Sequence, residues 1–448
     1  MPNPFKNIIN VKRSELPLAL LMFSYFFLVI TSFWILKPIK KWLFIGFYDQ
    51  QGFDLFNWHL SASQAELLAK VLNMLVALLA VTVFTLLARR FRREQLTFIF
   101  SLFFISSYIF YALILDQPSH LVVWSFYLFG DLFSTLMVAT FFSFLNDSVV
   151  PSAAKRLYGL IGLGGVLGGV FGASFVSIRI KQAMEAAGAG EAISFIYWMW
   201  ICLGIALLIM AIAYAAGLVV RRNPPEIPKK PAVTIKKSGG NAALEGARLV
   251  FQSRYLLAIV GIVGLYEIVS TVVDFQFTST IAHYLDGAAI GQQFSLMFTI
   301  TNWVSLFVQL FLTSYIMTRF GLTIALLVLP LAAAFGSMAF MAVPVLWVGS
   351  FLNTADNGFA YSINQSAKET LYTPTSRDEK YKAKAFIDMF VQRFAKAIAV
   401  GISLLVTTLF TDFSSIRWLS LFTLCVALLW IMAVRYAGRK FREMESSA

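Results

Sequence analysis

Long apolar runs separated by short polar connections make up most of this chain. A helix needs about 20 apolar residues to cross the roughly 30 Å hydrocarbon core of a bilayer. By that measure the pattern predicts twelve membrane-spanning helices and an all-α integral membrane protein. The expected spans are 16–36, 66–88, 96–115, 121–145, 158–178, 194–219, 255–282, 294–318, 321–341, 344–364, 385–410 and 416–436.

One extended hydrophilic stretch interrupts the pattern near the middle of the chain. It contains several prolines and lysines and a Ser-Gly-Gly sequence, a composition typical of a linker. Six plus six spans around a cytoplasmic linker is the layout of major-facilitator-like carriers, in which two halves rock about a central site. We therefore expect an N-terminal six-helix half over 1–220, a cytoplasmic linker over 221–247 and a C-terminal six-helix half over 248–448.

Composition supports the same class. Of the 448 residues, 59% are hydrophobic and 13% are charged, whereas soluble domains average about 25% charged residues. A soluble enzyme is therefore excluded. The cysteines, Cys202 and Cys425, both lie within apolar runs, so we expect neither a disulfide framework nor a metal cluster, and no cofactor. The polar N-terminus has no cleavage site before the first span, and we expect no signal peptide.

Lysine and arginine concentrate in every second connection, which the positive-inside rule assigns to the cytoplasm. This predicts a multi-pass protein of the cell inner (cytoplasmic) membrane with both termini cytoplasmic. Topology thus explains most of the net charge of +13, and nucleic-acid binding is not implied. The residues are Arg89, Arg90, Arg92 and Arg93 after the second span, Lys155 and Arg156 after the fourth, Arg319 after the eighth, and Lys368, Arg377, Lys380, Lys382 and Lys384 after the tenth.

Three lysines depart from this distribution, because Lys37, Lys40 and Lys41 come at the outward end of the first span. A lysine in a span is costly and usually faces a protein interior or a watery cavity. Lys37 and Lys41 share a helical face, and Pro38 can kink the helix beside them, so the lysines could form one cationic pocket. The alternative is that they snorkel to the headgroups beside flanking tryptophans.

Further ionisable residues lie within the apolar runs, where an unpaired charge is the expensive case. Each acid either forms a structural ion pair or acts as a gate or coupling site. If transport is coupled to protons, Asp131, Glu267 or Asp274 would be the favoured coupling site. Phosphates need several cationic donors, for which Lys37, Lys40, Arg393 and Lys396 are candidates. The intramembrane set is Asp131, Glu267, Asp274, Asp356, Asp388, Arg393 and Lys396.

The fifth span carries glycines at four-residue spacing between Gly159 and Gly172. Small residues at this spacing let helix backbones approach closely in lipid, so we expect this span to pack tightly against another. A phosphate-cradling loop would instead need a strand-to-helix turn followed by Lys-Ser or Lys-Thr, and neither is present. ATP hydrolysis by such a loop is therefore not expected.

Four stretches of the chain resemble the nucleotide transporter family of ATP/ADP translocases found in plastids and obligate intracellular bacteria. The resemblance covers most of the chain and implies a twelve-span carrier that exchanges ATP for ADP, with the fold unrelated to that of the mitochondrial carrier. Glutamate would be more typical at the acidic positions, and acids commonly stand where this chain has Pro38 and Lys41. The stretches are 35–41, 146–162, 273–277 and 368–388.

By motif, the resemblance places important transport roles on Lys40, Asp147, Asp274 and Lys382 or Lys384. The positive-inside rule alone would also explain the two last lysines. The residue arguments and the resemblance together give a substrate-binding set of Lys37, Lys40, Lys41, Asp147, Asp274, Lys382, Lys384, Arg393 and Lys396, and a gating or coupling set of Asp131, Glu267 and Asp388.

The leading hypothesis is a secondary transporter that exchanges nucleotides by alternating access and works as a functional monomer. Exchange would follow if the empty, strongly cationic cavity could not reorient. One alternative is a proton-coupled carrier of another organic anion, with Asp131 or Asp274 as the protonation site. A membrane enzyme or a scaffold ranks lower, because an enzyme would want histidines or clustered acids, and His59, His120 and His283 all lie in predicted loops.

Overall fold

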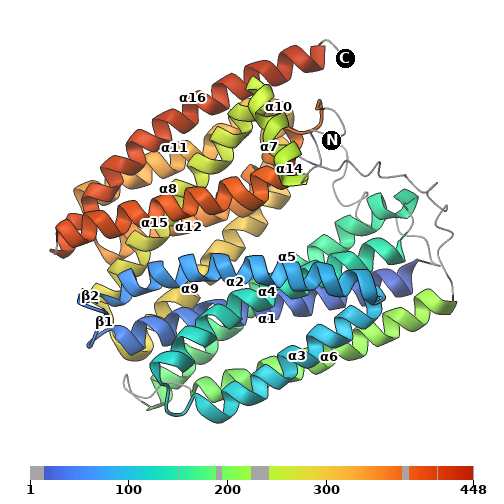
Figure 1. The fold of residues 1–448 in the computed structure, drawn as a ribbon, viewed down its shortest axis with the longest axis horizontal. Coiled ribbons are helices and arrows are strands. Elements are labelled where there is room, and N and C mark those ends of the chain that lie inside the picture. Colours follow the sequence, from blue (N-terminus) through green and yellow to red (C-terminus); the bar gives the residue numbers. More distant parts are fainter. Residues whose placement is uncertain are drawn as a thin grey trace. The chain divides into compact units, whose positions relative to one another are not determined.

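The computed structural model describes residues 15–149, 151–187, 194–222, 242–375, 383–410 and 412–446. Helices make up nearly all of these ranges (Figure 1). One short hairpin pairs β1 (Phe53–Leu55) with β2 (Trp58–Leu60) antiparallel, with Asp54 opposite His59. The prediction of an all-α protein is thus confirmed, with this hairpin as a small addition.

Before the linker the chain forms six long helices. They are α1 (Leu16–Tyr48), α2 (Ala62–Arg90), α3 (Arg93–Ile114), α4 (His120–Ser148), α5 (Pro151–Ala187) and α6 (Phe195–Arg222).

After the linker, the described residues include three π-helical turns and one 3₁₀ turn between the helices. The elements are α7 (Ala242–Gln252), α8 (Arg254–Tyr284), α9 (Gly287–Phe307), η2 (Val308–Leu312), α10 (Thr313–Arg319), α11 (Gly321–Ala342), α12 (Leu346–Phe359), η3 (Ala360–Asn364), α13 (Gln365–Thr370), α14 (Lys384–Phe386), η5 (Ile387–Val391), α15 (Gln392–Leu409), η6 (Phe413–Arg417) and α16 (Trp418–Ser446).

Within the described ranges, eleven helical segments are long and apolar enough to cross a membrane, which makes this a multi-pass membrane protein. The difference from the expected twelve lies at 344–364. There α12 has 14 residues before η3 begins, and polar residues such as Asn353, Asp356 and Asn357 lower the hydropathy. A π-helical turn by itself does not exclude a span, since the apolar segment Gly287–Arg319 contains η2. A π-helical turn replaces the i→i+4 ladder with i→i+5 bonds. The apolar pattern alone did not indicate this break.

The first span is longer than expected, because α1 continues past residue 36 to Tyr48 with Pro38 in its interior. Proline is tolerated in membrane helices when neighbouring groups satisfy the freed backbone. Lys37, Lys40 and Lys41 are therefore part of α1 itself.

The chain divides into two compact units. The first unit comprises Met1–Gly52, Leu72–Val233 and Asp286–Thr299, and the second comprises Phe53–Val71, Thr234–Leu285 and Ile300–Ala448. Two of the boundaries fall inside helices. As a result, the first turns of α2 belong to the second unit, and the first turns of α9 belong to the first.

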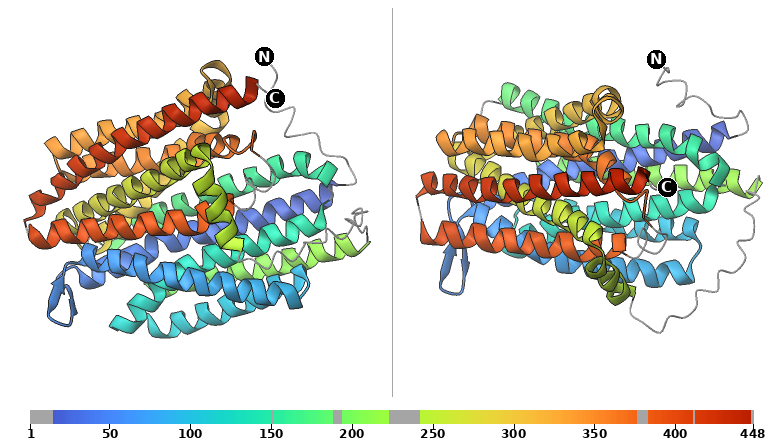
Figure 2. Two further views of the ribbon diagram at one scale, coloured as in Figure 1. Left: turned by 45° about the horizontal axis from the view of Figure 1, so that its top comes forward. Right: turned by 90° about the horizontal axis from the view of Figure 1, so that it is seen from above.

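In the first unit, α5 packs closely against α1 through its glycines, as the spacing predicted. A β-carbon built at Gly168 would lie 2.4 Å from the carbonyl oxygen of Phe27, and one at Gly172 would lie 2.6 Å from that of Thr31. The Thr31 hydroxyl donates to the Gly168 carbonyl at 3.3 Å. Helices α3 and α6 also lie side by side in this unit (Figures 1 and 2).

We expect Gly168→Leu to destabilise the protein by about 1–3 kcal/mol, because a side chain there meets backbone that cannot move aside. Thermal unfolding of the purified protein in detergent measures the loss. Gly162→Leu is the matched control, since a β-carbon at Gly162 meets nothing within 4 Å. Equal losses in both variants would contradict close packing at Gly168.

In the second unit, α8 packs against α12, α15 and α16. The start of α2 joins this unit, where Ser61 and Gln64 form reciprocal side-chain-to-backbone hydrogen bonds at 3.4 and 2.9 Å that cap the helix. The Gln64 amide also donates to Thr407 of α15 at 2.9 Å. These bonds fix the turn of α2 that carries Glu66 and Lys70.

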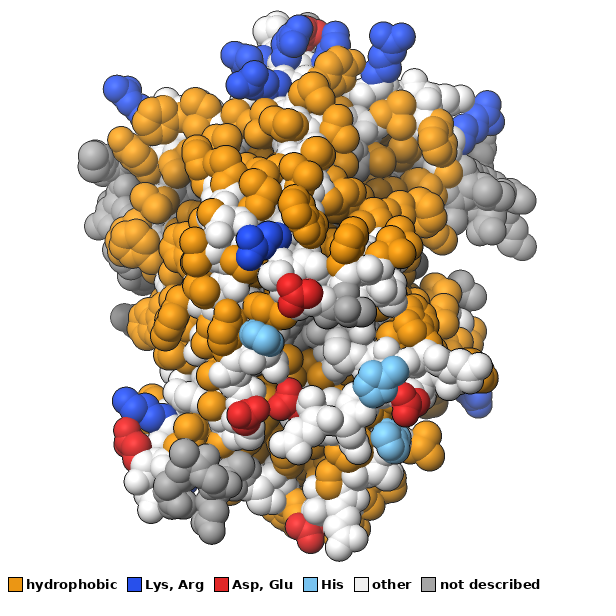
Figure 3. All heavy atoms as spheres, turned by 90° about the vertical axis from the view of Figure 1, so that its left-hand side faces the viewer, with side chains coloured by type: hydrophobic (Ala, Val, Ile, Leu, Met, Phe, Trp, Pro, Cys, Tyr) orange, Lys and Arg blue, Asp and Glu red, His pale blue; other side chains and the backbone are white. Residues whose placement is uncertain are grey.

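Large apolar side chains lie exposed on the outer surfaces. On α2, Leu75, Leu79 and Leu86 are 58%, 67% and 60% exposed. Apolar side chains also cover much of the face drawn in Figure 3. In water such a surface would be unfavourable, whereas lipid tails accommodate it.

Candidate functional site

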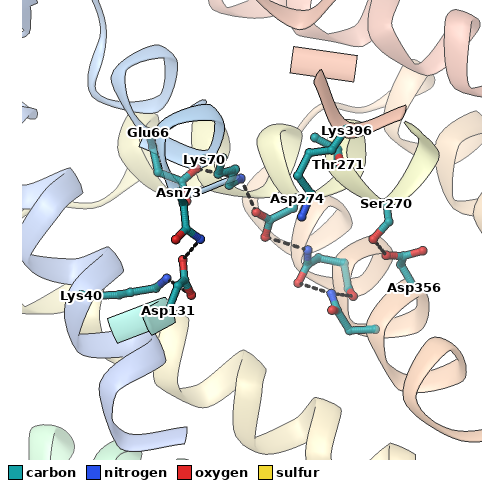
Figure 4. A network of polar contacts seen from close by, with 12 residues as sticks. Lys40, Glu66, Lys70, Asn73, Asp131, Ser270, Thr271, Asp274, Asp356 and Lys396 are labelled. Carbon is teal, nitrogen blue, oxygen red and sulfur yellow. Dashed lines mark hydrogen bonds and ion pairs between the residues drawn. The ribbon is translucent and has the colours of Figure 1, made fainter. Parts of the chain in front are cut away.

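Lys40 of the α1 cluster is buried, with 4% of the residue exposed, the same fraction as for Lys41. Its ammonium forms an ion pair with Asp131 of α4 (Figure 4). The ammonium also lies 4.3 Å from the centre of the Tyr127 ring. Glycine at position 130 makes room for the lysine stem, since a β-carbon there would lie 2.9 Å from Lys40 Cδ. A charge inside the membrane is thus stabilised by an acid and an aromatic face.

Asp131 uses both carboxylate oxygens. While one contacts Lys40, the other accepts a hydrogen bond from the Asn73 side chain of α2 at 2.6 Å. About a quarter (26%) of the Asp131 side chain remains exposed, against 5% for Lys40. The pair is therefore electrically balanced and open on its acidic side, where another anion could compete for the lysine.

The ammonium groups of Lys37 and Lys41 lie close to aromatic rings. The Lys37 ammonium lies 4.5 Å from the Trp34 ring centre and 4.7 Å from that of Phe298, and the Lys41 ammonium lies 5.3 Å from Phe294. Both phenylalanines belong to the first turns of α9. The described contacts of the three lysines thus differ, and the single cationic pocket stays a prediction. Lys40 faces α4, whereas Lys37 and Lys41 face α9.

Trp42 holds this part of α9 against α1 within the first unit. Its indole nitrogen donates to the carbonyl of Gly287 at 2.9 Å. A β-carbon at Gly291 would lie 2.3 Å from the indole ring, so the ring fills the space that this glycine leaves. The aromatic contacts of Lys37 and Lys41 depend on this docking.

A second ion-pair group lies in the second unit and includes a lysine that the sequence did not single out. Lys70 of α2 lies 2.5 Å from Asp274 of α8 and 2.9 Å from Glu66 of its own helix (Figure 4). Glu66 is fully buried, and the Asn353 amide donates to Asp274 at 3.4 Å. The available signal was the i,i+4 spacing of Glu66 and Lys70 within an apolar run.

Lys396 of α15 pairs with Glu267 of α8 at 3.1 Å. The described acid partner of Lys396 thus lies on another helix of the second unit. Arg393 lies one turn before Lys396 and is half-buried. Lys40, Lys70 and Lys396 therefore each contact a carboxylate, which offsets the cationic charge that the sequence suggested.

The remaining candidates lie away from these pairs. Asp147 is exposed near the end of α4, and Lys384 pairs with Glu369 at 2.5 Å beside the Tyr372 ring. Asp388 lies in the π-helical turn η5 with one carboxylate oxygen buried and without a hydrogen-bond partner. Lys382 lies outside the described residues.

Two acids meet just outside the membrane-spanning helices of the first unit. Burial, together with the neighbouring carboxyl of Asp286 and a hydrogen bond to it, raises the pKa of Asp49 from 3.8 to about 6. Asp49 follows α1, and Asp286 precedes α9. Between about pH 4 and 6 the folded protein therefore holds a proton that the unfolded chain has lost, and the free energy of unfolding falls as pH rises through this window.

We expect Asp49→Asn to abolish this contribution to the pH dependence. Near pH 4.5 the variant and the wild type should unfold at similar temperatures, and near pH 7.5 the variant should be the more stable, because wild-type Asp49 is then ionised beside another acid. Thermal unfolding across this range is the measurement. Asp116→Asn, at an exposed acid between α3 and α4, should follow the wild type. A constant gap between Asp49→Asn and wild type at every pH would contradict the assignment.

The amino-acid sequence is similar to those of known membrane carriers. A sequence model of the family described as TLC ATP/ADP transporter matches residues 118–441. ADP,ATP carrier protein 1, chloroplastic, of Arabidopsis thaliana is 22% identical over 359 residues, covering 72% of this chain and 55% of that protein. ADP,ATP carrier protein 3 of Rickettsia felis is 22% identical over 358 residues, covering 72% of this chain and 71% of that protein. The matched part thus spans about half the length of the chloroplast relative.

Solved structures show the same fold at low sequence identity. A bacterial homologue of the human lysosomal transporter Spinster, in an inward-facing and unoccupied conformation, has a TM-score of 0.63 at 13% identity and covers 96% of this chain and 99% of that chain. FucP, a Major Facilitator Superfamily transporter in its outward conformation, has a TM-score of 0.50 at 15% identity, with 95% and 99% coverage. The fold is therefore major-facilitator-like, as predicted.

Proposed function

Because the chain belongs to the TLC ATP/ADP transporter family, whose sequence model matches residues 118–441, we propose that it is a secondary transporter that exchanges nucleotides of the ATP/ADP type by alternating access. The relatives named above are ADP,ATP carriers. A shared family and a lysine-rich membrane interior support the same substrate class for this chain.

The observation that carries the proposal is Lys40, an almost fully buried lysine on a membrane-spanning helix with an acid as its partner. Such a lysine is expensive to keep in a membrane and is retained for function or for a pathway through the protein. Lys40 also belongs to the motif that carries the resemblance to nucleotide transporters. Nothing about packing alone requires an ion pair there, since apolar side chains of similar size stabilise a buried site as well or better.

We assign Lys40 to the nucleotide phosphates. An ammonium binds a phosphate as a point charge, so an arriving phosphate competes with Asp131 for Lys40 and frees the carboxylate. Lys37 and Lys41 contact the aromatic rings of Trp34, Phe298 and Phe294, and cation–π attraction contributes to holding their charges inside the protein.

In the second unit, Lys396 and Arg393 would take the same part, with Glu267 as the acid that competes for Lys396. Asp274 would act through Lys70, which it contacts. The other members of the predicted set, Asp147, Lys382, Lys384 and Asp388, retain a proposed role by their motifs or their place in a span.

The cellular setting follows from the charge pattern of the connections. We place the protein in the cell inner membrane with both termini in the cytoplasm, because the lysine- and arginine-rich connections belong on that side. The six-helix segments 1–220 and 248–448 would be the halves that alternate, joined by the linker 221–247. A single chain would suffice for transport, by analogy with carriers of this fold.

Uptake of labelled ATP into liposomes that contain the purified protein tests the proposal. We expect uptake into vesicles preloaded with ADP, and none into empty vesicles when no ion gradient is present. Protein-free liposomes with the same ADP load are the control for leakage. The absence of uptake into loaded vesicles would contradict nucleotide exchange.

A further inference from the structure

Asp356 of α12 is the intramembrane acid whose described contacts include no cation. The residue is 1% exposed. Ser270 of α8 donates to one carboxylate oxygen at 2.6 Å, and the other oxygen is buried with no hydrogen-bond partner (Figure 4). Its neighbours on α8 differ in this respect, because Glu267 contacts Lys396 and Asp274 contacts Lys70.

The two acids of α8 lie on the same helical face as the serine that contacts Asp356. Glu267, Ser270 and Asp274 lie three and four residues apart on α8 and so share one face. Glu267 and Asp274 form ion pairs with lysines, whereas Ser270 donates a hydrogen bond to Asp356. Asn353, one turn before Asp356, donates to Asp274. Asp356 thus lies near Glu267 and Asp274, whose lysine partners are already in ion pairs. The described hydrogen-bond donor to Asp356 is the hydroxyl of Ser270.

The ionised form of Asp356 would be costly in these surroundings. Removing a charge from water inside a membrane protein requires a counter-charge or several donors, and in their absence a carboxyl takes up a proton and becomes neutral. The neutral acid is less costly to bury, because it carries no net charge and a neighbouring hydroxyl can serve it as donor or acceptor. The surroundings of Asp356 match the neutral acid and not the carboxylate.

We propose that Asp356 is a proton-binding site and that its proton is exchanged with solution during the transport cycle. In the state described here the carboxyl holds the proton. In a state that opens α12 to water or brings a lysine of the α8 network to Asp356, the acid releases the proton and becomes a carboxylate. The proton is the only species bound or lost, so no other reactant is needed.

This inference extends the proposed function, since a carrier with such a site can use a proton gradient. With equal pH on both sides it would still exchange nucleotides one for one. With an acidic outside it would also accumulate nucleotide in empty vesicles, because a proton on Asp356 enters together with the nucleotide, is released inside, and the empty carrier returns with Asp356 deprotonated. Exchange does not need the proton gradient, whereas accumulation does. The contribution of Asp356 can therefore be measured separately from nucleotide binding.

The first experiment asks whether the proton is present, and it needs no substrate. Infrared spectra of the purified wild type near neutral pH should contain a carboxylic-acid carbonyl band that is absent in Asp356→Asn. Ser270→Ala should shift this band, since it removes the hydrogen bond to the acid. Asp116→Asn, which removes an exposed acid, should leave the band unchanged. The same band in wild type and Asp356→Asn, or none in wild type, would overturn the proposal.

The second experiment asks whether the proton moves. An inward proton gradient should drive ATP into empty vesicles that contain the wild type, and Asp356→Asn should lose this uptake while it keeps ATP/ADP exchange, because asparagine mimics the neutral acid. Undiminished gradient-driven uptake by Asp356→Asn would overturn the coupling. If the wild type moves no nucleotide at all, the proposed function fails, and the infrared band still decides whether Asp356 binds a proton.

Discussion

Replacing Lys40 with alanine is expected to reduce ATP/ADP exchange by at least ~30-fold. Truncating one partner of a buried, hydrogen-bonded charge pair costs about 2–5 kcal/mol, and each 1.4 kcal/mol is about tenfold in an equilibrium constant. Lys40 is 4% exposed and paired with Asp131, so water cannot replace the lost ammonium. Initial rates of ATP uptake into ADP-loaded vesicles, normalised to the amount of reconstituted protein, measure the effect.

Lys40→Ala also leaves Asp131 without its lysine, which could weaken the fold. The double variant Lys40→Ala/Asp131→Asn removes both charges and should recover thermal stability without recovering exchange. Asp131→Asn alone should bind ATP more tightly, because the carboxylate that competes with phosphate is gone. Lys181→Ala is the matched control, at a lysine that is 67% exposed. Normal exchange by Lys40→Ala would contradict the phosphate role.

Replacing Lys70 with methionine is expected to destabilise the protein by about 3–5 kcal/mol, the usual cost of removing one partner of a buried ion pair. Lys70 contacts Asp274 and the fully buried Glu66. Without the ammonium, two acids remain close together inside the protein, and both ionised forms become unfavourable. Thermal unfolding in detergent should show the loss, and the yield of folded protein should fall with it.

A set of neutral variants separates lost charge balance from lost packing. The triple variant Glu66→Gln/Lys70→Met/Asp274→Asn contains no charge in this group and should regain most of the stability that Lys70→Met loses. Lys181→Met, at an exposed lysine, should change the unfolding temperature little. A triple variant as unstable as Lys70→Met would contradict the account, because packing and not charge would then explain the loss.

Much of the fold could be predicted from the apolar pattern alone. Runs of about 20 apolar residues have few alternatives to membrane helices, and the family and the major-facilitator-like fold are both confirmed. The pattern was less informative at 344–364, where polar residues such as Asn353 and Asp356 lower the hydropathy and α12 passes into η3 after 14 residues. Hydropathy records how apolar a segment is, and it does not record whether its backbone bonds run to the fourth or the fifth residue.

The candidate site was predictable only in part. Lys40 stood out because a lysine in a span is unusual, and the structure gives it an acid partner in Asp131. Lys70 was missed, although it lies in a predicted span, because its partner Asp274 is 204 residues away. Pairing between helices depends on which faces meet in three dimensions, and a single sequence does not contain that information.

The most direct test of the central claim, that Lys40 binds nucleotide phosphate in competition with Asp131, is a distance measurement between lysine nitrogen and phosphorus. Protein with ¹⁵N-labelled lysine side chains, bound to ATP in lipid, would be studied by solid-state magnetic resonance for dipolar coupling between Nζ and ³¹P. The account predicts coupled lysine signals in the wild type, of which the Lys40 signal is lost in Lys40→Arg, a variant that keeps the positive charge, whereas a Lys396 signal remains. The same set of coupled lysine signals in Lys40→Arg and wild type, or no coupled lysine in wild type with ATP bound, would contradict the claim.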